Sequence, residues 1–180
     1  FFVLILGCPL LVSGALYENG TVKCPDETVG VTFTLTIDGV DTTFTKVNRS
    51  MLDEIILAGD YENLTTVCTT GVEDMSAMFK RKYTFNSSIS TWDTSSVTNM
   101  IEMFFGVSSF NSDISKWDTS SVTKMQYMFY GAEKFNSDIS DWTTASVTRM
   151  DYMFANAITF NSDISNWIIS SVTNMEGMFT

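Results

Sequence analysis

The feature that most constrains the fold is a segment that recurs every 25 residues in the second half of the chain. One copy reads FNSDISKWDTSSVTKMQYMF and runs from Phe110 to Phe129. Three positions keep their residue type from copy to copy: Trp92, Trp117, Trp142 and Trp167; Val97, Val122, Val147 and Val172; and Met75, Met100, Met125, Met150 and Met175. A strict period of this length predicts a solenoid, in which each unit buries its apolar side against the next.

The apolar spacing changes within each unit, and that change predicts the secondary structure. In one unit the apolar residues lie at i, i+3, i+6, i+7 and i+10, on one face of a helix: Val97, Met100, Met103, Phe104 and Val107. A serine pair before them can cap a short helix. Residues 110–117 are rich in Asn, Ser and Asp and are expected to form a short parallel strand. The expected fold class is an α/β solenoid of stacked units over residues 72–180.

Stacking should bring equivalent side chains into rows along the solenoid. Two rows are expected in the core: Phe85, Phe110, Phe135 and Phe160, and Ile89, Ile114, Ile139 and Ile164. A third row should bond backbone groups at a corner: Asn86, Asn111, Asn136 and Asn161. The tryptophan row leaves two alternatives, because it can close the core or form an exposed aromatic interaction face. The methionines are expected to fill the core.

Residues 16–71, which precede the repeats, are expected to form a small α+β cap. Residues 30–37 alternate apolar residues with threonine, Asp38-Gly39 turns the chain, and residues 40–47 continue the alternation less strictly. This pattern predicts a β-hairpin. A cap is what a solenoid needs at its first unit, whose apolar face would otherwise meet water.

A helix and a short strand are expected after the hairpin. Asn48 or Ser50 can cap a helix over residues 51–58, which carries an apolar stripe and which Gly59 ends. Residues 64–67 are expected to form a strand that leads into the array.

Residues 1–15, FFVLILGCPLLVSGA, are apolar and uncharged, and they end on small residues. This pattern predicts a secretory signal peptide, or a membrane anchor if the segment is retained. The alternative is a lipobox at residues 5–8, in which Cys8 would carry the lipid. Either reading places the chain outside the cytosol.

Two further cysteines, Cys24 and Cys68, follow the apolar segment. An even number of cysteines in an exported chain predicts a disulfide, and two free buried thiols are the alternative. No metal site is expected from them, because structural zinc takes four nitrogen or sulfur ligands and the chain has no histidine.

The net charge of −11 leaves no basic patch to follow phosphates, so neither nucleic acid nor an anionic membrane surface is an expected partner. Acidic residues outnumber basic ones by nine to three in residues 17–71 and by twelve to seven in residues 72–180. Because the negative charge is spread over both parts, it is interpreted as a contribution to solubility in preference to a localised cation-binding site. Because nucleophile-elbow and P-loop motifs are also missing from the sequence, we expect neither an enzyme nor a cofactor.

The unit FNSDISxWDTSSVTxMxxMF resembles the mycoplasma- and protist-rich branch of the BspA-type leucine-rich-repeat surface proteins. The resemblance covers residues 72–180, where apolar, Asn, Trp and Met-Phe positions match over four consecutive units. It implies a secreted or surface-attached leucine-rich-repeat solenoid, commonly of unassigned function, with adhesion proposed for relatives. It implies no catalytic residue. One departure is Ile168-Ile169, which replaces the Asp-Thr found at Asp93-Thr94.

Four Asn-x-Ser/Thr sequons are candidate glycosylation sites in an exported eukaryotic protein: Asn19, Asn48, Asn63 and Asn86. The high Ser and Thr content would produce most of them by chance. Asn48 and Asn63 lie in predicted connections and are the better candidates, whereas burial of the asparagine row would block Asn86.

Two rows of polar residues are candidate ligand-binding sites. The first offers carboxylates in register: Asp113, Asp138 and Asp163. These could hold calcium, but Ser88 occupies the equivalent position of the first unit, and turn capping is the favoured role. The second row would present hydroxyls to ice or a glycan, interrupted by Ile169: Thr94, Thr119 and Thr144.

The function expected from the sequence is a non-enzymatic extracellular or cell-surface scaffold, structural or adhesive, that acts through protein–protein contacts. Phe179-Thr180 stops inside a unit and leaves an apolar edge, so the expected partners include further copies of the chain, up to a fibre. The alternative is a glycan- or ice-binding protein that uses the Trp and Thr/Ser faces. A membrane would be contacted only through residues 1–15.

Overall fold

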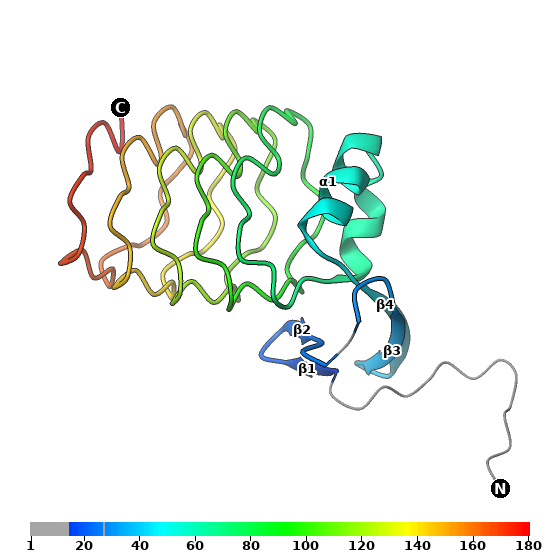
Figure 1. The fold of residues 1–180 in the computed structure, drawn as a ribbon. Helices are drawn as coiled ribbons and strands as arrows, with labels where there is room; N and C mark the ends of the chain where they lie inside the picture. The colour runs from blue at the N-terminus through cyan, green and yellow to red at the C-terminus, as the bar shows by residue number, and fades with distance from the viewer. Residues whose placement is uncertain (1–14, 27) are drawn as a thin grey trace, which may run out of the picture.

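The computed structural model describes residues 15–26 and 28–180, so the predicted signal segment lies outside the described residues except for Ala15. A small cap of strands and one α-helix comes first, and the remaining chain runs in coils that lie side by side (Figure 1). The coils extend away from the cap, and the carboxyl end lies in the coil farthest from it. The cap and the coils are thus two differently built parts of the described chain.

Two small sheets build the cap. Strands β1 (Leu16–Glu18) and β2 (Thr21–Lys23) form an antiparallel pair. Strands β3 (Thr32–Ile37), β4 (Val40–Lys46) and β5 (Val67–Cys68) form the second sheet in that order, with β3 and β4 antiparallel and β4 and β5 parallel. The predicted hairpin is therefore confirmed. Asp38 and Gly39 turn it with positive φ angles of 51° and 81°, as a tight two-residue turn requires.

Helix α1 (Arg49–Ala58) lies where the sequence predicts a helix. Asn48 caps it, because its side chain accepts a hydrogen bond from the backbone N–H of Met51, and Gly59 ends it in the left-handed conformation. The predicted strand at residues 64–67 is mostly wrong. A 3-10 helix, η1 (Tyr61–Thr66), precedes the two-residue β5 and buries Leu64 against α1 and the first coil.

The coils pair at one position per unit. Parallel bridges join residues of the same register from each unit to the next: Asp74, Asn99, Lys124, Arg149 and Asn174. The parallel strand expected at residues 110–117 is not found there, because the pairing lies on the Val-Thr-x-Met segment instead. On this segment the N–H of Thr123 donates to the carbonyl of Thr98, and the N–H of Met100 donates to the carbonyl of Lys124.

Turns replace the helix expected in each unit. From Met75 onward, alternate N–H groups donate to the next coil: Met75 to Asn99, Ala77 to Ile101, Phe79 to Met103 and Arg81 to Phe105. The N–H groups of Met78, Lys80 and Lys82 close turns to the carbonyl three residues earlier, as Met78 does to Met75. A helix would send every N–H to the carbonyl four residues earlier, so bonding between coils and a helix within the unit exclude each other.

The turn segments also hold residues in the left-handed region, which a helix cannot contain. One position of each unit has φ between 53° and 58°: Ala77, Glu102, Tyr127, Tyr152 and Gly177. Glycine adopts this conformation most readily, and other residues pay roughly 1–2 kcal/mol for it. Only the last unit has glycine at this repeat position.

Replacing Ala77 with glycine should therefore stabilise the protein. The expected gain in the free energy of unfolding is about 1 kcal/mol, because the exposed alanine has φ 53°. Urea denaturation measures it. Ala58→Gly, in the last turn of α1, is the matched control and should destabilise the protein, since glycine weakens a helix. A loss of stability in Ala77→Gly would contradict the left-handed turn.

A continuous core runs from the cap through the coils. It contains Leu52 and Ile56 of α1 together with the predicted Phe, Ile, Val and Met rows. In the last unit the rows leave the core, because Phe160, Ile164 and Val172 are only partly buried and Met175 is 39% exposed, contrary to the core position predicted for it. The phenylalanine rings stack from coil to coil, with centroids 5.9 Å apart between Phe85 and Phe110 and again between Phe110 and Phe135. A separate cluster lies inside the cap: Val22, Cys24, Phe33, Phe44 and Cys68.

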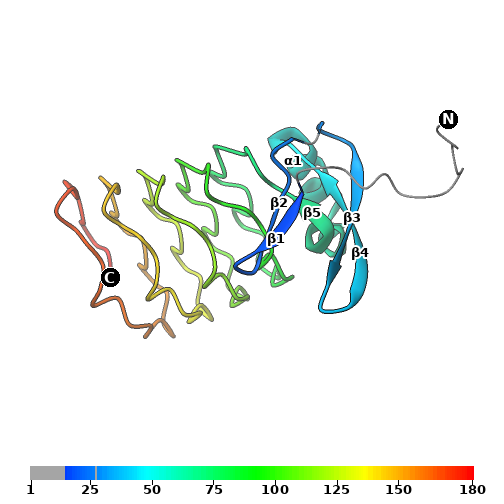
Figure 2. The same cartoon turned by 90° about the horizontal axis from the view of Figure 1, so that it is seen from below.

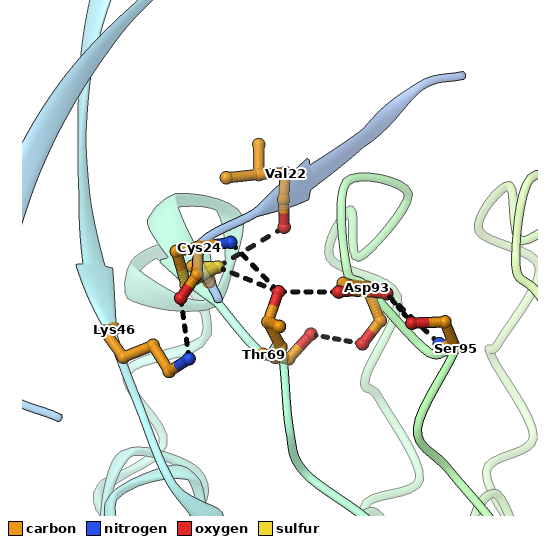
Figure 3. Close-up of a disulfide and its surroundings, with 8 residues drawn as sticks. Val22, Cys24, Lys46, Thr69, Asp93 and Ser95 are labelled. Carbon is orange, nitrogen blue, oxygen red and sulfur yellow. Dashed lines mark hydrogen bonds between the residues drawn. A yellow bond between two sulfur atoms is a disulfide. The ribbon is translucent and has the colours of Figure 1, made fainter. Parts of the chain in front are cut away.

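The predicted pair Cys24 and Cys68 forms a disulfide within this second cluster (Figure 3). Both cysteines are fully buried. Thr70 links the disulfide to the first coil, because its hydroxyl accepts a hydrogen bond from the N–H of Cys24 and donates one to Asp93 at 2.6 Å. The N–H of Val22 also donates to the carbonyl of Thr91. The disulfide thus joins the two sheets of the cap at the point where the cap meets the array.

Candidate interaction surface

The tryptophan row lies inside the coils, which corrects the predicted tryptophan interaction face. Trp92, Trp117, Trp142 and Trp167 are 0%, 3%, 3% and 8% exposed. Each indole stacks on the next at 6.4 to 6.5 Å between ring centroids. Each Nε1–H donates to a carbonyl 28 residues earlier, those of Leu64, Ile89, Ile114 and Ile139. A buried indole whose only donor is satisfied cannot serve as a contact stripe.

The threonine row is also internal. Thr94, Thr119 and Thr144 are each 1% exposed, and their hydroxyls donate to backbone carbonyls of the next unit, those of Asp118, Thr143 and Ile168. This row therefore holds neighbouring coils together. The hydroxyl face considered for ice or a glycan does not exist at these positions.

The asparagine row bonds backbone groups at a corner, although it lies at the surface. Asn111, Asn136 and Asn161 each donate their backbone N–H to the side-chain Oδ1 of the preceding asparagine at 2.7 Å. The first of these acceptors is Asn86, whose side chain is exposed. Burial is therefore not what would restrict a glycan at Asn86.

The aspartate row caps turns. Asp113, Asp138 and Asp163 each accept the backbone N–H of the serine two residues later at 2.9 to 3.0 Å. These backbone hydrogen bonds, with those of the serine side chains, lower the pKa of Asp138 and of Asp163. Among the described residues, no group of three or more acidic or cysteine side chains could hold a metal ion.

The other predicted sequons lie on the cap. Asn19 is exposed in the turn between β1 and β2, and Asn48 is exposed at the start of α1. Asn63 is exposed in η1, where its Nδ2 donates to Asp60 at 2.5 Å. All four predicted glycosylation sites therefore have surface side chains, and glycosylation at each of them stays a prediction.

A group of aromatic side chains on the turn segments is the surface feature that the sequence analysis missed. We call it the aromatic patch and define it as Phe105, Tyr127, Tyr130 and Tyr152. All four side chains are half-buried. Phe105 stacks on Tyr130 with ring centroids 4.7 Å apart, and Tyr127 stacks on Tyr152 at 5.1 Å. Contacts at 6.1 and 6.4 Å join the two pairs into one patch across three coils.

Charged and small residues border the patch. The Lys80 ammonium lies 5.1 Å from the centroid of the Phe105 ring and bonds to Glu102 at 2.7 Å. At the other end, Gly177 packs so closely on Tyr152 that a Cβ at this position would collide with the ring. The stacking and these neighbours thus cover part of each ring, and the rest of each half-buried side chain is open to solvent. Within the described chain, no hydrogen bond engages the hydroxyls of Tyr127 and Tyr130.

Two of the tyrosines occupy costly backbone positions. Tyr127 and Tyr152 have φ of 57° and 55°, in the left-handed region that bulky side chains rarely adopt. A glycine, as in the last unit, would avoid this cost. The position is left-handed in every unit, so the repeat sets this conformation and the two tyrosines adopt it in place of a smaller residue.

Tyr152 should ionise at higher pH than an ordinary tyrosine. Its hydroxyl donates to Glu176 Oε1 at 2.8 Å, and this hydrogen bond, followed by the negative charge of Glu176, raises its pKa. The raised pKa means that the contact stabilises the fold below the ordinary pKa of tyrosine and is lost as pH rises above it. Ultraviolet titration of tyrosinate should show one late-ionising group that Glu176→Gln returns toward normal. Glu133→Gln is the control, and a profile unchanged by Glu176→Gln would contradict the contact.

No helix in residues 15–26 and 28–180 is long and apolar enough to cross a membrane.

The structure defines the chain as a repeat protein, with coils of one repeated segment beside a disulfide-bonded cap. The family described as "Mycoplasma protein of unknown function, DUF285" matches residues 45–143 and 115–180, and the chain belongs to it. Searches among curated proteins and among solved structures found no match.

Proposed function

We propose that the protein is a non-enzymatic scaffold or adhesion module of the cell surface, a leucine-rich-repeat-like solenoid that binds other proteins through exposed side chains of its coils. The aromatic patch is the observation that carries the proposal. Tyrosine and phenylalanine are enriched in the centres of protein–protein interfaces, and the rim around such a centre is polar. The patch has this composition, with Lys80 and Glu102 beside it.

The location outside the cell is supported by the Cys24–Cys68 disulfide, since such bonds persist in oxidising compartments. The family's printed description connects the chain with mycoplasma proteins of unknown function and says nothing about their location. Protease treatment of intact expressing cells tests the location. Loss of the protein from intact cells supports the proposal, and protection until lysis counts against it.

A cell-binding experiment tests the function. Fluorescently labelled protein is added to cultured epithelial cells, and flow cytometry measures the bound label. The Tyr127→Ser, Tyr130→Ser double variant should lose binding, because it removes the centre of the aromatic patch. The Thr98→Ser, Thr148→Ser double variant is the matched control on the neighbouring exposed segment and should bind as the unchanged protein does. Equal binding by both variants, or none by the unchanged protein, would reject the proposal.

A further inference from the structure

The free edge of strand β3 carries unpaired backbone groups. β3 pairs only with β4 and forms one border of the three-stranded sheet. Figure 2 shows the β3–β4 hairpin at the end of the molecule opposite the last coil, where the array does not cover it. An exposed strand edge is a template for pairing with another extended chain.

The hairpin turn fixes which residues face outward. In a hairpin with a two-residue turn, the pair beside the turn, Ile37 and Val40, is hydrogen bonded, and bonded pairs alternate from there. The bond from the N–H of Lys46 to the carbonyl of Val31 at 3.0 Å fits this alternation. Three residues are left with N–H and C=O groups on the outer edge, and no described residue bonds to those groups: Thr32, Thr34 and Thr36.

We propose that this edge pairs with the same edge of a second copy of the chain, antiparallel, about a two-fold axis at Thr34. The three outward residues are spaced evenly around Thr34, so Thr34 faces its own copy and Thr32 faces Thr36. All six outward groups of each strand then bond, in six hydrogen bonds. The inference names one partner of the proposed scaffold, and it goes beyond the aromatic patch.

The side chains suit this pairing. Opposed threonines stabilise a sheet, and the structure has such a pair within the hairpin, where Thr34 Oγ1 lies 3.2 Å from Thr43 Oγ1. On the opposite face of the sheet, the pairing places Val31, which is 38% exposed, beside Ile37 of the second copy, which is half-buried against the cluster inside the cap. Each copy thereby covers apolar surface of Val31.

Charge favours the second copy in this orientation. β3 reads TFTLTI and has no charged residue, in a chain whose net charge is −11. The two carboxylates within the hairpin, Asp38 and Asp41, lie at its turn end. Antiparallel pairing puts the turn ends of the two copies at opposite ends of the joined strands, so these carboxylates stay apart. Natural edge strands commonly carry a charge to prevent pairing, and this one does not.

Sedimentation velocity of the full chain over a range of concentrations tests the inference. The unchanged protein should show a dimer that grows with concentration. Thr34→Lys and Thr34→Glu should each lose the dimer, because like charges would face each other at the axis. An equimolar mixture of these two variants should regain it, since opposite charges then meet. Thr43→Lys, on the same face one strand inward, is the matched control and should keep the dimer.

Several outcomes would overturn the inference. They are a protein that stays monomeric at every concentration, a dimer that survives Thr34→Lys, and a mixture of the two variants that stays monomeric. Circular dichroism checks folding. If Thr34→Lys fails to fold, Thr34→Cys replaces it and should form a covalent dimer on oxidation, which Thr43→Cys should not. Loss of cell binding in the aromatic-patch variant is a separate result, so the dimer and the proposed function can fail independently.

Discussion

Replacing Cys24 and Cys68 together with alanine is expected to lower the free energy of unfolding by about 4 kcal/mol. The two residues are 44 positions apart, so the disulfide closes a long loop and restricts the unfolded chain strongly. Both sulfurs are buried, and the bond also fixes the sheet that covers the start of the array. This is the largest effect we expect from the cap.

Thermal and urea denaturation followed by circular dichroism measure this change. The unchanged protein unfolded under reducing conditions is the matched control, because it should lose the same stability as the double alanine variant. A difference below about 1 kcal/mol would show that the loop is held by other contacts. A reduced protein as stable as the oxidised one would contradict the prediction in the same way.

Trp117→Ala is expected to lower the free energy of unfolding by about 3–5 kcal/mol, the usual range for removing a large buried aromatic side chain. Its ring stacks between Trp92 and Trp142, and its Nε1–H bonds to the carbonyl of Ile89 at 3.1 Å. The variant would open a cavity between coils and remove a bond between units. Its effect on binding should follow from lost stability, since the indole is buried.

Trp167→Ala is the matched control, because it has a tryptophan neighbour on one side only and is 8% exposed. Trp167→Ala should lower the free energy of unfolding clearly less than Trp117→Ala does. Urea denaturation of both variants measures the two changes. Equal costs, or a cost for Trp117→Ala below about 1 kcal/mol, would contradict the burial of the row.

The sequence predicted the structure correctly where a residue has a local structural role or a fixed spacing. The hairpin turn at Asp38-Gly39, the cap at Asn48 and the core rows follow from local chemistry and from the period of 25, and the structure contains them. The disulfide follows from counting cysteines in a chain read as exported. The burial of Trp117 could only be offered as one of two alternatives.

The sequence misled where backbone bonding decides the structure. The spacing Val97, Met100, Met103 and Phe104 fits a helix, but it also fits successive turns that keep the same side chains inside. Hydrogen bonds to the next coil favour the turns, and the local sequence does not reveal those hydrogen bonds.

The aromatic patch was missed because its residues do not repeat. Its members lie at positions where other units carry Lys, Glu, Ala, Gly or Thr, so the repeat gave no signal for them. Aromatic residues at variable repeat positions are the signal that would have found them.

The bonds that join the coils reach only to the neighbouring unit. The indole of Trp117 bonds one unit back, the hydroxyl of Thr119 bonds one unit forward, and Asn111 bonds to Asn86. Duplicating or deleting a whole 25-residue unit inside the array would therefore restore every such bond, whereas losing part of a unit would break a full set. The length of the array can thus change during evolution by unequal recombination in whole steps, while the cap and its disulfide remain unaltered.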